Sequence, residues 1–149
     1  MRPHPPTPLW SLTIEGTMPG LNELTLAKGN SYGRGMSGYT KLKKEWGERI
    51  VRCVRGRGET RTRPIAAPVH VHIIYCEPDA RRDHDNIDAG GRKLLLDGLV
   101  LAGVLAGDGP RHVRDLLATF RKPSNECPCV RIDLYDASAT CVRITEGRA

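Results

Sequence analysis

The stretch VHVHIIYCEPDARRDHDN occupies residues 69–86 and joins a strand pattern to an acidic motif. In its first eight residues, Val69, Val71, Ile73 and Tyr75 alternate with His70, His72, Ile74 and Cys76, which predicts a strand with one apolar face. The motif that follows places Asp83 and Asp85 one residue apart, directly after two arginines. In an extended backbone these two carboxylates project to the same side, so we expect them to converge on one hard cation while His84 faces the other way.

A helix is predicted over much of 87–102, where leucines and other apolar residues recur. Asp85 or Asn86 is a good N-cap for this helix, and Gly103 is a good C-terminal stop. The paired glycines 90–91 weaken its first turns. The start of the helix could therefore shift by one turn.

The rest of the chain adds strands and one further helix. Apolar residues recur at every fourth position from Thr40 to Val54, which predicts an amphipathic helix with a basic outer surface. The glycine-rich polar segment 24–38 has no period and is predicted to be a loop. The other predicted strands are residues 10–15, 112–120, 130–135 and, as a short last strand, 141–144. Together the elements predict an α+β fold in which two main helices pack a small mixed β-sheet.

The length of 149 residues suits one domain, which we place at residues 9–149 after a proline-rich, disordered lead-in at 1–8. The net charge of +6 favours a polyanionic partner, although charge alone does not choose among DNA, RNA and an anionic surface. The sequence has no run of about twenty apolar residues, and its start lacks the apolar centre of a signal peptide. We therefore expect a cytoplasmic protein without a membrane segment.

Cysteine usage argues against a disulfide framework, because the chain has five cysteines and no secretion signal. Most of these thiols are expected to be reduced and partly buried. Cys127 and Cys129 could supply two metal ligands, but no second pair stands at zinc-like spacing, and the start of a strand is the preferred interpretation. His70 and His72 are interpreted as sheet-packed or solvent-facing for the same reason.

Phosphodiester hydrolysis requires charge neutralisation on the phosphate and activation of a water, and Mg²⁺ held by a few carboxylates provides both. Asp83 and Asp85 need a third partner, for which the spacing alone does not decide. The candidates are Asp79, Asp88, Asp97, Asp108 and Asp115. Asp108 is modestly favoured because it lies in a glycine-flanked turn, where functional carboxylates are common. The alternative for Asp83 and Asp85 is an Asx-turn with a helix cap.

Several separated motifs resemble one family. They are Arg82-Asp83-His84-Asp85-Asn86, then Lys93, Asp97-Gly98-Leu99, Ala102-Gly103-Val104 and Gly107-Asp108. This series resembles the RusA family of Holliday junction resolvases of bacteria and phages. The segment 19–22 is also similar to the P-P-x-N turn that follows the first strand in that family. The matches extend over about residues 10–135.

The resemblance implies a homodimeric, Mg²⁺-dependent endodeoxyribonuclease that nicks two strands of a four-way DNA junction symmetrically, with Mn²⁺ as a substitute ion. It implies that Asp83, Asp85 and Asp108 bind the metal and that Lys93 is the catalytic lysine. The interval from Asp85 to Lys93 is about four residues longer than in the best-known member of the family, or roughly one helical turn. An ordinary ion pair between Lys93 and Asp97 at i+4 is the alternative.

Contacts to DNA are expected from a second set of residues, which are Arg81, Arg82, Lys41, Lys43, Lys44 and Asn22. The arginines and lysines suit phosphate contacts, against the alternative of solvated surface charge, and Asn22 belongs to the family-like turn. Two other functions fit the same residues. One is a protein that binds branched nucleic acid without cutting it, and the other is a metal-dependent nuclease acting on flap or single-stranded DNA.

Overall fold

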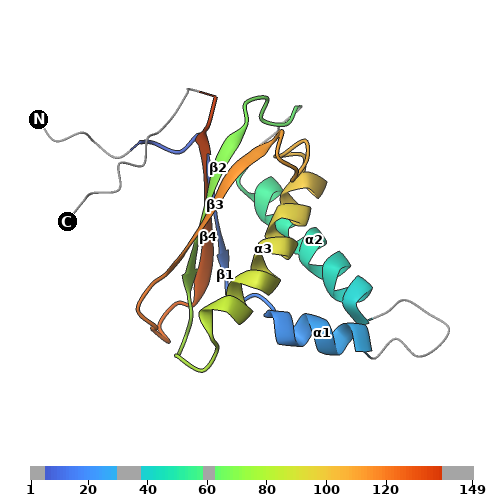
Figure 1. Cartoon of the computed structure of the whole chain (residues 1–149), viewed down its shortest axis with the longest axis vertical. Coiled ribbons are helices and arrows are strands. Elements are labelled where there is room, and N and C mark those ends of the chain that lie inside the picture. Colours follow the sequence, from blue (N-terminus) through green and yellow to red (C-terminus); the bar gives the residue numbers. More distant parts are fainter. Residues whose placement is uncertain (1–5, 30–37, 59–62, 139–149) are drawn as a thin grey trace, which may run out of the picture.

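The computed structural model describes residues 6–29, 38–58 and 63–138. In these residues, three helices cover one face of a four-stranded sheet (Figure 1). In chain order the elements are β1 (Trp10–Glu15), α1 (Leu21–Gly29), α2 (Gly38–Gly56), β2 (Val69–Cys76), α3 (His84–Leu101), β3 (Val113–Phe120) and β4 (Cys129–Asp136). The predicted strand at 141–144 and the first five residues of the lead-in lie outside the described ranges.

The sheet is mixed, as predicted, with strand order β1-β4-β2-β3. Strands β2 and β3 are parallel, whereas β4 pairs antiparallel with both β1 and β2. Parallel neighbours need a crossover, which α3 provides by running back along the sheet. A residue that follows β2 and a residue that precedes β3 therefore lie toward opposite ends of the sheet.

One hydrophobic core lies between the sheet and the helices. The inward face of β2 is almost completely buried, and Ile73, at its centre, pairs with Ile132 of β4. Helix α2 confirms its predicted amphipathic pattern, because Trp46, Ile50 and Val54 form its buried stripe. None of the helices in the described residues is both long enough and apolar enough to cross a bilayer.

Helix α1 occupies part of the segment that we predicted to be a loop, so the sheet is packed by three helices and not two. Its sequence has no clear apolar stripe, and Leu24 is its buried anchor. Two caps stabilise its first turn, one local and one tertiary. The Gly20 amide donates to the Glu23 carboxylate, and the Asn22 amide donates to Asn86 Oδ1 at 2.8 Å. These caps satisfy amides that would otherwise lack a partner at the helix start.

The N-cap of α3 is Asp83, not Asp85 or Asn86 as predicted. Asn86 is already used as the cap of α1, so its side chain does not close its own helix. The predicted stop is confirmed, because Gly103 has a φ of 76° and only glycine adopts this conformation without strain.

The glycine pair inside α3 is a packing device. An ideal Cβ on Gly90 would lie 2.4 Å from the Pro19 carbonyl oxygen and 2.5 Å from the carbonyl carbon of Gly20. A Cβ on Gly91 would lie 2.8 Å from the Tyr75 hydroxyl. The sequence argument treated both glycines only as weak helix formers. The structure shows that they let α3 approach the turn before α1 and the end of β2.

Gly90→Ala is therefore expected to destabilise the fold, because its new methyl group meets backbone that has little freedom to move. Overpacking of this kind costs about 1–3 kcal/mol, although alanine is the better helix former. Gly56→Ala is the matched control, since nothing lies within 4 Å of its ideal Cβ. Thermal unfolding measures both. Equal melting temperatures for the two variants would contradict the close approach.

Candidate functional site

Asp83 and Asp85 lie at the N-terminus of α3 and open onto one cavity of about 590 Å³. Asp83 has extended backbone angles, φ −70° and ψ 147°, and occupies the N-cap position without a side-chain capping hydrogen bond. In the described part of the chain, neither carboxylate has an ion-pair or hydrogen-bonding partner. The alternative of a helix cap is therefore correct for the position of Asp83, but its carboxylate does not form the capping hydrogen bond.

The prediction that His84 faces away from Asp83 and Asp85 is wrong. Helix α3 begins at His84, so the alternation of side chains along a strand does not apply between Asp83 and Asp85. His84 lines the same cavity and stacks on Phe120, with ring centroids 3.8 Å apart and planes at 3°. The two aspartates share the cavity because they lie in one helix start.

Arg82 makes several contacts within the protein. Its guanidinium bonds both Glu77 carboxylate oxygens, at 2.7 and 3.1 Å, and donates to the Met18 carbonyl at 2.8 Å. It also lies 3.5 Å from the Glu23 carboxylate. The side chain is 20% exposed. Arg82 thus joins the end of β2 to the β1–α1 turn, in addition to its predicted place beside Asp83.

Arg81 differs from its neighbour, because its side chain is 87% exposed and its one ion pair is a 3.5 Å contact with Asp79. Sequence reasoning missed Arg121, which lines the cavity beside Asp83 and Asp85. Arg121 follows the last residue of β3, and its amide donates to the Tyr75 carbonyl at 3.0 Å. The parallel pairing of β2 and β3 brings it there, so a sequence pattern along one strand does not reveal it.

Asp108 lies in a second cluster with Lys93. The Lys93 ammonium is 2.9 Å from Asp97 Oδ1 and 3.7 Å from Asp108 Oδ2. Lys43 of α2 reaches the other Asp97 oxygen at 3.4 Å. The i+4 pair that was the alternative for Lys93 is thus present, and so is the proximity of Lys93 to Asp108.

The two clusters are separate within one chain. Asp97 and Asp108 line a different cavity, between α2 and α3, and Asp85 is about 12 Å from Lys93 along the helix axis. The whole interval from Asp85 to Lys93 lies within the continuous helix α3. Among residues 6–29, 38–58 and 63–138, no three His, Cys, Asp or Glu side chains are placed to hold one metal ion. The chain alone therefore brings Asp83 to Asp85 but not to Asp108.

The other candidates for the third carboxylate have protein partners. Asp88 accepts a 2.9 Å hydrogen bond from Tyr75 and pairs with Arg92. Burial, together with Asp88, raises the pKa of the Tyr75 hydroxyl well above its ordinary value. Asp115 contacts His70 at 2.7 Å. Asp79 lines the cavity of Asp83 and Asp85 but also accepts from the Arg81 amide.

The predicted DNA-contacting lysines lie on α2. Lys41, Lys43 and Lys44 are all exposed, and Lys43 also forms an ion pair with Asp97. Asn22 is exposed at the start of α1, and its backbone amide donates to the side chain of Asn86. Among the described residues, no hydrogen bond or ion pair joins these side chains to Arg81, whose partner is Asp79.

The described cysteines are free thiols, as expected. Cys53, Cys76 and Cys129 are partly buried, and Cys127 is exposed. Cys129 is the first residue of β4, which confirms the strand-start interpretation.

The Asp97 carboxylate raises the pKa of Lys93, mainly through its hydrogen bond, and Asp108 adds a smaller effect. Lys93 therefore stays protonated throughout the neutral range. We expect Asp97→Asn to lower the pKa of Lys93 more than Asp108→Asn does. Titration of the Lys93 side chain by heteronuclear NMR measures both shifts. A larger effect of Asp108→Asn would contradict the observed order of contacts.

Comparison with known proteins leaves the site to be judged on its geometry, since no protein-family model and no curated protein matches the chain.

Proposed function

We propose that this protein is a Mg²⁺-dependent endodeoxyribonuclease that acts on four-way DNA junctions. The observation that carries the proposal is the pair Asp83 and Asp85, whose unpartnered carboxylates open onto one cavity. Both residues are exposed, so neither carboxylate is kept from a ligand by burial. Their negative charge is favourable at a helix N-terminus, yet two uncapped carboxylates beside arginines also suit a hard cation and a phosphate.

The donor set fits magnesium. Mg²⁺ commonly takes one or two carboxylates and completes its octahedron with waters and substrate phosphate oxygens. When bound, it supplies neutralisation of phosphate charge and activation of a water. Asp83 and Asp85 would hold the ion, and Arg121 in the same cavity and the neighbouring, exposed Arg81 would orient the phosphate through their guanidinium groups. The stacked rings of His84 and Phe120 line one side of the cavity.

In the described chain, Asp108 and Lys93 lie in a separate cluster from Asp83 and Asp85. They would act at the same phosphate only if another copy of the chain or a rearrangement on binding closes the distance. A homodimer is part of the proposal, since paired nicks in a symmetric junction need two sites.

A protein that binds branched nucleic acid without cutting is the second candidate. The observation in its favour is that the described residues assemble no three-ligand group for a metal. A panel of junction, flap, duplex and single-stranded DNA, each with and without Mg²⁺, separates these functions. Preferential nicking of the junction supports the proposal, nicking of flap or single strands assigns another nuclease, and tight binding without nicking supports the second candidate.

A further inference from the structure

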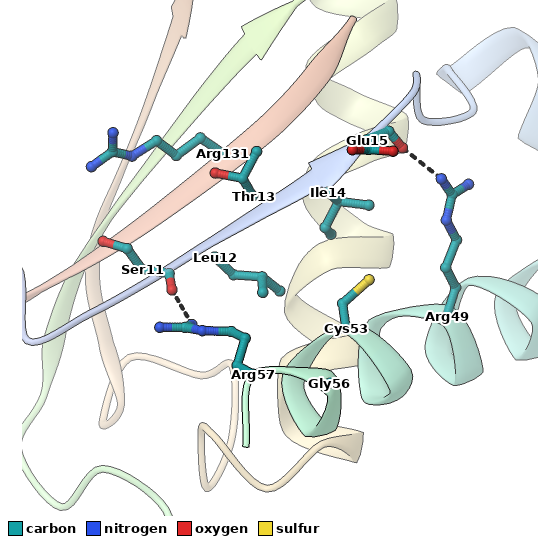
Figure 2. A pocket seen from close by; sticks show the side chains of 10 residues that line it. All are labelled: Ser11, Leu12, Thr13, Ile14, Glu15, Arg49, Cys53, Gly56, Arg57 and Arg131. Atoms are coloured by element: carbon teal, nitrogen blue, oxygen red, sulfur yellow. Dashed lines mark hydrogen bonds between the residues drawn. The ribbon is translucent and has the colours of Figure 1, made fainter. Parts of the chain in front are cut away.

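A groove of about 650 Å³ follows the outer edge of β1, where that strand faces α2 (Figure 2). In the sheet, β1 pairs only with β4, so its other edge has no strand neighbour among the described residues. Arg49 of α2, Arg57 just after the end of α2, and Arg131 of β4 line the groove together with Cys53. This is a strongly basic site away from the cavity of Asp83 and Asp85.

Two of the arginines are held in place. Arg57 donates to the Ser11 carbonyl, and Arg49 donates to the Glu15 carbonyl at 2.5 Å (Figure 2). Each guanidinium also lies over a tryptophan ring, Arg49 at 4.6 Å from Trp46 and Arg57 at 5.2 Å from Trp10. These contacts use one N–H of each arginine and leave the others to a ligand.

The bonding at this edge disfavours an added β-strand. A strand partner needs the outward carbonyls of β1, and two of these, on Ser11 and Glu15, already accept hydrogen bonds from arginine. Positive charge exceeds negative charge in the lining, where Glu15 is the one acidic residue. Arg131 is partly offset by Asp133 at 2.8 Å, so Arg49 and Arg57 are the main anchors.

The spacing of these anchors suits an extended anion. The carbonyls that hold Arg57 and Arg49 belong to Ser11 and Glu15, which are four residues apart on β1, or roughly 13 Å along the strand. A single small anion would not bridge the two guanidinium groups, whereas two phosphates along one strand would. Phosphate groups accept guanidinium hydrogen bonds in the same bidentate way as carboxylates.

A cation–π contact places the groove next to a third cavity, which borders the cavity of Asp83 and Asp85. Trp46, under Arg49, lines a neighbouring cavity together with Arg81 and Arg82. That cavity in turn shares Asp79 and Arg82 with the cavity of Asp83 and Asp85. A strand lying on Arg57 and Arg49 would therefore be led past Arg81 to the two carboxylates.

We propose that the β1–α2 groove binds the phosphodiester backbone of one nucleic-acid strand through Arg49 and Arg57. This inference deepens the proposed function and rests on it for the identity of the substrate. Binding is measured without divalent cations, by fluorescence anisotropy with a labelled four-way junction, so that cutting does not enter. R49Q/R57Q is compared with R55Q/R114Q, which removes the same charge from exposed positions outside the groove.

We expect R49Q/R57Q to raise Kd at least tenfold and to lower the slope of log Kd against log salt by about two, whereas R55Q/R114Q has a smaller effect. Thr13→Glu is a second variant, because it places a negative charge in the groove at an exposed residue and keeps both arginines. It should also weaken binding. Bound junction should protect Cys53 from alkylation, measured by peptide mass spectrometry, while the exposed Cys127 serves as the reference.

The outcomes separate the two proposals. Equal Kd values for both double variants, or an unprotected Cys53, overturn the groove and leave the nuclease proposal intact. A parent protein that binds through the groove but never cuts with Mg²⁺ supports the groove and overturns the nuclease. Binding of an acidic peptide in preference to DNA overturns the assignment of the groove to nucleic acid.

Discussion

Asp83→Asn and Asp85→Asn are each expected to reduce Mg²⁺-dependent nicking of a four-way junction by about a hundredfold or more. Each replaces an anionic metal ligand by a neutral amide, and loss of several kcal/mol of metal-borne stabilisation corresponds to that factor. The protein fold should persist, because neither carboxylate has a partner among the described residues. Gel assays of labelled junctions under single-turnover conditions measure the rate.

Asp136→Asn is the matched control, since it makes the same chemical change at an exposed carboxylate at the end of β4. Its nicking rate should equal that of the parent. Junction binding by the Asp83 and Asp85 variants should be at least as tight as that of the parent, because a negative charge near phosphate has been removed. Unchanged nicking by both variants would remove these residues from the site.

Arg82→Gln is expected to destabilise the protein by about 2–3 kcal/mol, because it leaves Glu77 without its bidentate partner. Glu77 is only 8% exposed, so water does not fully replace the arginine. The link to the Met18 carbonyl is lost as well. For a chain of this size, the melting temperature should fall by about 5–10 °C.

The adjacent arginine offers the control. Arg81→Gln removes the same charge from a side chain that is 87% exposed, so its melting temperature should stay close to that of the parent. DNA binding should weaken in Arg81→Gln if this arginine contacts phosphate. A loss of binding in Arg82→Gln without a loss of stability would instead mean that Arg82 is mainly a ligand for DNA.

The strands and the two long helices could be predicted because their patterns are local. Apolar residues alternate along β2 and recur at every fourth position in α2, and each pattern states which face is buried. Helix α1 has no such pattern, and one of the two caps of its first turn comes from Asn86, which is remote in sequence. The predicted N-cap of α3 was wrong because the helix begins at His84, so Asp85 and Asn86 already lie in its first turn.

The candidate site was only partly predictable. Asp83 and Asp85 are close in sequence, so they stay close in space whatever the backbone conformation. The contacts of Arg82 and the position of Arg121 depend instead on which segments pack beside β2. A signal for the separation of Asp108 was present in the sequence. A strand, an unbroken helix and a second strand favour a parallel crossover, which carries the residues after the helix to the far end of the sheet.

The most direct test of the account is cleavage of a synthetic four-way junction, labelled in turn on each strand, by the parent protein with Mg²⁺ and with a chelator. We expect paired nicks in two opposite strands with Mg²⁺ and none with the chelator. Intact junctions under Mg²⁺ and Mn²⁺, at protein concentrations that saturate binding, would contradict the account.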